Sequence, residues 1–337
     1  MTRKFLILSV AFVIASVLGG CNFINMAEEV SVLRVYSQLP PEITHSLASD
    51  FEKASKGKVK IELVGGTHKQ TGEKNVSRAS GDFDVWLGGT AEDYFLADTK
   101  KQLQPYQTKN FQNKEPALRD KHGAWTGLFS TNLVFVANRN ALIEAGLRVP
   151  SSWQDLLQEN FKDGIVFSEP GLRQGGFRFL TTLWQLFGEN MTDDYLQKLK
   201  TLSPAYTESD AAAIEAVRTG KKAVTVVPLD LAMTAAISNN ILVIGVPEEG
   251  TARIVIGAAI MNTTKSEALA RNFMDFLDSE RVRIILDNSD YYVWPLAEPP
   301  QKYTWGRAYS DVFLVNEDLR WSVLNSEEIA DKLRPLK

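Results

Sequence analysis

Cysteine and histidine are scarce in this sequence of 337 residues, which has one cysteine and three histidines. The single cysteine, Cys21, cannot form a disulfide within the chain. His45, His68 and His122 are far apart in the sequence, and none belongs to an H-E-x-x-H pair, so no zinc-hydrolase motif is present. The G-x-S-x-G and P-loop patterns are also missing. We therefore expect no enzymatic activity and no cofactor.

An excess of positive charge is lacking as well, because 37 lysines and arginines stand against 41 aspartates and glutamates. A nucleic-acid-binding surface needs a basic stripe, so this balance argues against nucleic acid as a partner. After the first 20 residues, no apolar run reaches the ~20 residues that a membrane span requires. The sequence therefore predicts a water-soluble body, and its length fits two lobes of ordinary size.

The N-terminus has the layout of a secretory signal. Arg3 and Lys4 precede an apolar segment over 5–18, which is too short for a membrane span. The segment ends at Leu18-Gly19-Gly20-Cys21, which resembles a bacterial lipobox, where cleavage leaves the cysteine as a lipid-modified N-terminus. We therefore predict a signal peptide over 1–20, lipid attachment (palmitate) at Cys21 and a tether over 21–30. The alternative is an ordinary signal peptide with a stray thiol.

The rest of the chain alternates strand and helix patterns. A short apolar strand over 32–36 is followed by helical spacing of apolar residues up to Gly57, and another strand is predicted over 58–64. Such β-α-β units favour an α/β fold with a parallel sheet. Ligands of open α/β sheets bind at the carboxyl ends of the strands, where Ser37 and Gln38 follow the first strand.

A second turn at this edge is Gly88-Gly89-Thr90, between a strand predicted over 83–87 and a helix over 91–97. Glycines at a helix start can expose backbone N–H groups at the positive end of the helix dipole, which suits an anionic or polar ligand. The alternative is a tight turn in which Thr90 caps the helix. On sequence alone, Gly89 and Thr90 fit both interpretations equally well.

The third turn follows a strand predicted over 164–167 and opens an apolar helix. It contains Arg173-Gln174-Gly175-Gly176, in which a cation stands beside two glycines, a combination that can bind a carboxylate or a phosphate. The alternative is that Arg173 is a solvated surface residue. A fourth turn places Asp230 after the buried strand predicted over 223–227, at the same edge of the sheet.

The order of several motifs is more specific than any one of them. These motifs are Val35-Tyr36-Ser37, Asp84-Val85-Trp86-Leu87-Gly88-Gly89-Thr90, Trp125-Thr126-Gly127, Pro150-Ser151-Ser152-Trp153-Gln154-Asp155-Leu156-Leu157, Glu169-Pro170 with Gly175-Gly176-Phe177, and Pro247-Glu248-Glu249-Gly250-Thr251. In this order they resemble the bacterial extracellular solute-binding proteins that feed ABC importers, of the type that includes ferric-iron, phosphonate and sugar-phosphate binders. The resemblance extends over about residues 32–295.

This resemblance implies a two-lobed α/β fold of the periplasmic-binding-protein type (type II), with the ligand between lobes that two crossing strands join near 133–138 and 253–261. Lobe one then comprises 31–132 and 262–337 with the C-terminal tail, and lobe two comprises 133–261 with the hinge strands. The residues at the converging turns are the expected ligand-binding residues: Ser37, Gln38, Gly89, Thr90, Arg173, Gln174, Gly175, Gly176 and Asp230.

The resemblance leaves two classes of ligand to compare. Its iron-binding members have a tyrosine pair after the strand over 223–227, where this chain has Asp230-Leu231. Pro40 and Gly88-Gly89 stand where those relatives carry a histidine and an acid, so we expect no metal at these turns. We predict a small anion with a phosphate or phosphonate, whose hydroxyl or ammonium group contacts Asp230. Tyr291-Tyr292 is a remaining tyrosine pair and keeps ferric-iron binding as the alternative.

The resemblance also implies a place and a partner. We expect a monomer that is anchored by its lipid to a bacterial membrane on the extracytoplasmic side, in the periplasm or at the cell surface, and that delivers its ligand to the permease of an ABC transporter. A sensor that docks on a histidine kinase is a different function for the same fold. The sequence does not separate import from sensing.

Overall fold

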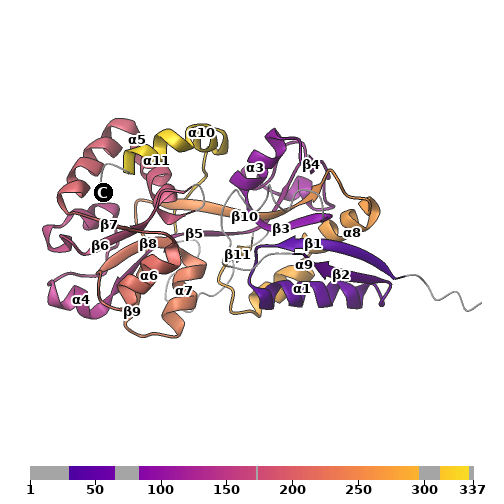
Figure 1. The fold of residues 1–337 in the computed structure, drawn as a ribbon, viewed down its shortest axis with the longest axis horizontal. Helices are drawn as coiled ribbons and strands as arrows, with labels where there is room; N and C mark the ends of the chain where they lie inside the picture. Colours follow the sequence, from indigo (N-terminus) through magenta and orange to yellow (C-terminus); the bar gives the residue numbers. More distant parts are fainter. Residues whose placement is uncertain (1–29, 65–82, 172–173, 296–311, 334–337) are drawn as a thin grey trace, which may run out of the picture.

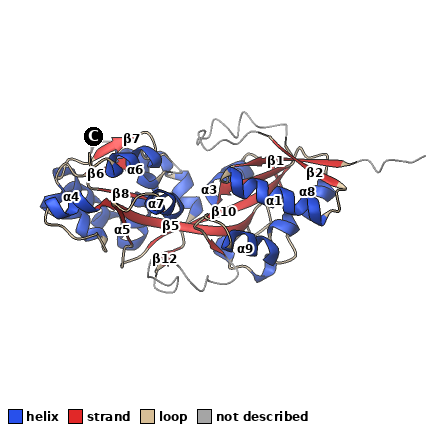
Figure 2. Ribbon diagram, turned by 90° about the horizontal axis from the view of Figure 1, so that it is seen from below, coloured by secondary structure: helices blue, strands red, loops and turns tan. Residues whose placement is uncertain are grey.

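The structure of the chain is a computed structural model, and it describes residues 30–64, 83–171, 174–295 and 312–333. Two α/β lobes lie side by side, and long strands run from one lobe into the other (Figures 1 and 2). This arrangement confirms the predicted two-lobed fold with two crossing strands. Cys21 and Arg173 lie outside the described residues. Among the described helices, none combines the length and the apolar character that crossing a membrane requires.

Lobe one is built around a parallel β-α-β unit, as the sequence predicts. Strand β1 pairs in parallel with β2 and β3, and helices α1, α8 and α9 contact one another. Apolar side chains of the helices and of β1 share one core, in which Leu33, Leu47 and Phe273 are almost inaccessible. The elements are β1 (Ser31–Ser37), α1 (Pro41–Ala54), β2 (Val59–Leu63), β3 (Val85–Thr90), α3 (Ala91–Thr99), β4 (Leu103–Gln104), 3₁₀ turns at Phe111–Asn113 and Pro116–Leu118, α8 (Glu267–Leu277) and α9 (Glu280–Asp287).

Lobe two repeats this plan with its own core. Strand β6 pairs in parallel with β7 and β8. Helix α5 consists of two helices that meet at Gly188, whose backbone is not helical. The elements are α4 (Arg139–Glu144), 3₁₀ turns at Trp153–Leu157 and Glu159–Phe161, β6 (Ile165–Ser168), α5 (Gly175–Thr201), β7 (Ala205–Thr207), α6 (Asp210–Arg218), β8 (Val224–Pro228), α7 (Leu229–Ile237) and β9 (Leu242–Gly245).

Two antiparallel strands, β5 (Thr126–Asn138) and β10 (Thr251–Met261), connect the lobes. The first part of β5 pairs with β10 and with β11 (Trp294–Pro295), and its second part pairs with β8 and β9. Every residue of β5 is buried. The strand changes partners between Asn132 and Leu133, where its pairing with β10 ends and its pairing with β8 begins, at the start of the crossing predicted near 133–138.

The C-terminal segment 312–333, called the strap below, differs from the predicted boundary, which assigned it to lobe one. Its elements are β12 (Leu314–Val315), α10 (Leu319–Leu324) and α11 (Ser326–Leu333). Helix α10 contacts α3 of lobe one, whereas α11 contacts α5 of lobe two (Figure 1). Apolar side chains of the strap explain its contact with lobe two. Ile329 is buried in the core of lobe two, and Trp321 packs edge-on against Trp184.

The glycines that open α5 allow this helix to approach the ends of β6 and β8. A Cβ atom at Gly176 would lie 2.2 Å from the carbonyl oxygen of Ser168, and one at Gly175 would lie 2.4 Å from that of Val226. Backbone atoms cannot give way as a flexible side chain can. These two positions therefore require glycine for packing, whatever ligand the turn contacts.

We predict that Gly176→Ala destabilises the protein by about 1–3 kcal/mol, the usual cost of forcing an extra carbon into a packed site. Gly171→Ala is the matched control, because a Cβ there meets only Gln174 at 3.6 Å or more. Urea unfolding followed by circular dichroism measures both variants. Equal stability of the two variants would contradict the close approach at Gly176.

Candidate ligand-binding cleft

The first predicted turn, Ser37-Gln38, contacts the second. Gln38 N donates to the carbonyl of Leu87 over 2.9 Å, and the half-buried Gln38 side chain accepts a hydrogen bond from Trp86 Nε1 over 3.3 Å. The Ser37 hydroxyl is buried and lies 2.7 Å from the Thr44 hydroxyl. Gln38 is therefore more exposed to solvent than Ser37, whose hydroxyl is hydrogen-bonded to Thr44 in the first turn of α1.

The second turn has the geometry of a helix cap. Gly89 N donates to Tyr94 Oη over 2.9 Å, and Thr90 N donates to Asp93 Oδ2 over the same distance. Thr90 and Asp93 form a capping box at the start of α3, in which Glu92 is a second acidic residue. The amides of Gly89 and Thr90 are thus bonded within the chain, which is the alternative that the sequence left open.

The third turn is also bonded internally. Gly175 N donates to the carboxylate of Asp210 over 2.9 Å, and Gly176 N donates to Ser168 Oγ over 3.1 Å. Gln174 is the residue before α5, and its Nε2 donates to the Glu208 carbonyl over 3.1 Å. The carboxylate of Asp210 thus occupies the helix start where the sequence suggested an external anion.

Asp230, the fourth predicted residue, lies at the start of α7 beside the crossing strand β5. Its half-buried carboxylate accepts a hydrogen bond from Thr131 Oγ1 over 3.2 Å. Removal from water raises the pKa of Asp230 to about 6, and this effect outweighs the hydrogen bonds, which lower the pKa. Burial, and then the charge of Asp230, raise the pKa of Tyr291 well above its usual range. Asp230 and Thr131 therefore meet beside the crossing strand, and the charge of Asp230 also acts on Tyr291.

The tyrosine pair at the hinge is divided between two environments. Tyr291 packs edge-on against Phe129, with ring centroids 5.6 Å apart. Tyr292 instead packs against a separate apolar cluster of lobe two that includes Val134 and Leu229. Among the described residues, no group of three or more histidine, cysteine, aspartate or glutamate side chains is arranged to hold a metal ion.

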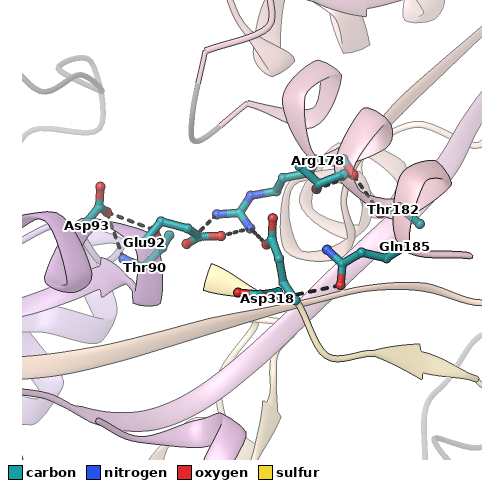
Figure 3. Close-up of polar contacts among 9 residues, drawn as sticks. Thr90, Glu92, Asp93, Arg178, Thr182, Gln185 and Asp318 are labelled. Atoms are coloured by element: carbon teal, nitrogen blue, oxygen red, sulfur yellow. Dashed lines mark hydrogen bonds and ion pairs between the residues drawn. The ribbon is translucent and has the colours of Figure 1, made fainter. Parts of the chain in front are cut away.

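A buried ion pair that the sequence did not identify joins the two lobes (Figure 3). Arg178, in the first turn of α5, donates from Nη1 and Nη2 to the two carboxylate oxygens of Glu92 in α3, over 2.6 and 3.1 Å. Glu317 of the strap adds a carboxyl 3.7 Å from Arg178 Nη1. The three side chains are only 1%, 2% and 3% exposed. One guanidinium therefore links lobe one, lobe two and the strap.

The sequence contains a signal for this site. Arg178 interrupts the apolar start of an otherwise buried helix segment over 175–183, and a charged residue in such a position is almost never buried without a partner. The partners, Glu92 and Glu317, are distant in the sequence, so no local pattern indicates them.

The two glutamates of this cluster have opposite pKa shifts. Burial disfavours the charged form of Glu92, but the Arg178 guanidinium outweighs it and lowers the pKa of Glu92 to about 2. Burial, and then the charge of Glu92, raise the pKa of Glu317 to about 8. The guanidinium thus favours the charged form of Glu92, whose negative charge in turn favours the protonated form of Glu317.

We predict that the free energy of unfolding falls as the pH rises from about 5 to 8. A carboxyl with a higher pKa in the folded than in the unfolded chain favours folding below its unfolded value, 4.5 for Glu317, and this contribution is lost as the pH rises through about 8. Glu317→Gln cannot ionise, so its unfolding free energy should vary less with pH. Urea unfolding at several pH values measures the slope, with Glu328→Gln as an exposed control. An unchanged slope in Glu317→Gln would contradict this assignment.

Comparison with known proteins places the chain in a family. The family model for bacterial extracellular solute-binding protein matches residues 85–308, so the chain belongs to this family. The Fe(3+)-binding periplasmic protein of Serratia marcescens is 25% identical over 267 residues, which cover 77% of this chain and 77% of that protein. These results confirm the resemblance identified in the sequence.

Solved structures show the same fold. The periplasmic binding protein AfuA of Actinobacillus pleuropneumoniae, with fructose-6-phosphate bound, matches with a TM-score of 0.74 and 20% identity, over 90% of this chain and 98% of that chain. Iron-bound HitA of Pseudomonas aeruginosa matches with a TM-score of 0.70 and 18% identity, over 91% and 99%. The chain is thus an extracytoplasmic solute-binding protein of the ABC-importer type, and its relatives are binding proteins rather than enzymes.

Proposed function

We propose that this solute-binding protein is a monomeric lipoprotein, anchored through Cys21, that captures a small polar solute with a phosphate or phosphonate group and delivers it to the permease of an ABC importer. The observation that supports this ligand class is the pair of opposite charges at the cleft. Asp230 stands at the start of α7, and Arg178 stands in the first turn of α5.

Asp230 and Arg178 set different demands on the solute. The ionised Asp230 carboxylate can only accept hydrogen bonds, so its partner is a hydroxyl or an ammonium group. A guanidinium instead matches the oxygens of a phosphate or phosphonate. A phosphorylated sugar or an aminophosphonate meets both demands in one molecule. Gln38 adds an amide that can bond to hydroxyl groups.

Closure of the lobes is the proposed capture step. A solute that contacts Asp230 in lobe two and Gln38 in lobe one stabilises the arrangement in which both are near it, so binding shifts the population towards the closed form. The crossing strands β5 and β10 can bend to permit this motion. The permease would then recognise the closed shape.

Ferric iron is a second candidate, and one observation favours it. The charge of Asp230 acts on the Tyr291 phenol, and both side chains are hard oxygen donors of the kind that ferric iron prefers. The Serratia relative is an iron-binding protein by name. In this case Tyr291 would lose its proton on binding the metal.

A ligand screen tests the proposed class. We predict that fructose 6-phosphate, another phosphorylated sugar or an aminophosphonate raises the midpoint of thermal unfolding, whereas ferric citrate leaves it unchanged. A solute at ~100 times its dissociation constant adds ~2.7 kcal/mol. Stabilisation by ferric citrate alone would reject the organic phosphate and favour the iron alternative.

The contribution of Asp230 is tested with the solute that the screen identifies. We predict that Asp230→Asn weakens binding by about 10- to 100-fold, the value of a charge-assisted hydrogen bond. Asp194→Asn, an exposed aspartate on α5, is the control and should bind normally. Wild-type affinity should also fall below about pH 6, where Asp230 gains a proton. Calorimetry measures these affinities, and full affinity in Asp230→Asn would contradict the assigned contact.

The lipid anchor has its own test. We predict that cells which produce the protein incorporate labelled palmitate into it and retain it in the membrane fraction. Cys21→Ser should abolish the label and release the protein, because no other cysteine is present in the sequence. Palmitate labelling that persists in Cys21→Ser would contradict attachment at Cys21.

A further inference from the structure

The cluster around Arg178 contains two carboxyl groups, those of Glu92 and Glu317, for one guanidinium. Glu92 takes both terminal nitrogens of the guanidinium, and Glu317 stays 3.7 Å away, beyond hydrogen-bond distance. Within the described part of the chain, Arg178 Nε and both carboxyl oxygens of Glu317 have no hydrogen-bond partner. Buried polar atoms without a hydrogen-bond partner are rare, because burial removes their hydrogen bonds to water and nothing replaces these bonds. The cluster therefore keeps unused hydrogen-bonding capacity.

The position of Arg178 places this capacity at the boundary between the two lobes. Arg178 lies one turn after Gly175 and Gly176, whose amides are already bonded, so the guanidinium is the group at this helix start that can still bind an anion. The side chains whose charge acts on it are all acidic: Glu92, Glu317, Asp93 and Asp210. The planar fork of arginine binds a phosphate or a carboxylate through two parallel hydrogen bonds.

We propose that Arg178 binds the anionic group of the solute, a phosphate or a carboxylate, and that Glu317 of the strap occupies its place until the solute arrives. This inference rests on the proposed function and deepens it, since it assigns the anion-binding residue. Glu317 suits an occupant that leaves, because its carboxyl lies 3.7 Å from Arg178 Nη1 and is held less closely than Glu92. Glu92, which has two short bonds to Arg178, remains as the positioning residue.

Glu317 borders a small recess that is partly open to solvent. The residues that line it include Ala91, Glu92, Ala117, Arg253, Asn316 and Glu317. We expect a carboxyl that leaves Arg178 to turn towards this recess. Because α10 and α11 follow Glu317 in the chain, the departure should also loosen the strap.

The first test compares the affinity for fructose 6-phosphate in four proteins by calorimetry. Glu317→Ala removes the occupant and should bind about 10-fold more tightly than the wild type. Glu328→Ala, an exposed glutamate on the same strap, should bind as the wild type does. Arg178→Gln should bind at least 100-fold more weakly. If Glu317→Ala binds no more tightly than the wild type, or if folded Arg178→Gln retains wild-type affinity, the proposal is wrong.

The second test needs no knowledge of the solute and uses the unaltered protein. Inorganic phosphate should accelerate hydrogen exchange in α10 and α11 relative to chloride at the same ionic strength, because it displaces Glu317 from Arg178. Equal exchange in the two salts would overturn the proposal. If ferric citrate is the only compound that stabilises the protein, the proposed function fails, and this exchange measurement still decides the role of Arg178.

Discussion

Two crossing strands constrain everything else in this structure. Because β5 and β10 pair with each other and continue into both lobes, the lobes share one sheet and can move only by bending these strands. The hinge therefore fixes which elements can meet across the cleft. It brings the start of α3 opposite the start of α5, and it places Thr131 of β5 beside Asp230 of α7. The polar residues of the candidate site follow from this geometry.

The electrostatics of the cleft depend on where the carboxylates lie. The positive ends of α3, α5 and α7 are each close to acidic side chains of the chain itself, Asp93, Asp210 and Asp230. These helix starts are therefore satisfied without an external anion. The buried guanidinium of Arg178 is different, because breaking a buried ion pair leaves an uncompensated charge and costs several kcal/mol. Its bond to Glu92 thus ties the two lobes together, while the strap covers it.

Much of the fold was predictable because it depends on local patterns. The alternation of apolar strands with helical spacing indicated the β-α-β units, and motifs as distant as Trp153 and Gly250 proved to be in contact, since Trp153 Nε1 donates to the Gly250 carbonyl. The candidate site was less predictable. The glycine turns at Gly89 and Gly175 looked open in the sequence, but Tyr94 and Asp210 bond to their amides. Arg178 and Glu317 were missed because their partnership depends on tertiary contacts, and the strap crosses to lobe two for the same reason.

We infer that the buried contact between Arg178 and Glu92 sets the relative position of the lobes. Pulsed electron paramagnetic resonance tests this directly by measuring the distance between two spin labels, one in each lobe. The labels are attached to Ile143→Cys in α4 and Ile284→Cys in α9, at positions that are 70% and 50% exposed. Cys21→Ser removes the one native cysteine. We expect the distribution of distances between the lobes to become broader and longer when Glu92→Gln is added. A distribution that Glu92→Gln leaves unchanged would contradict it.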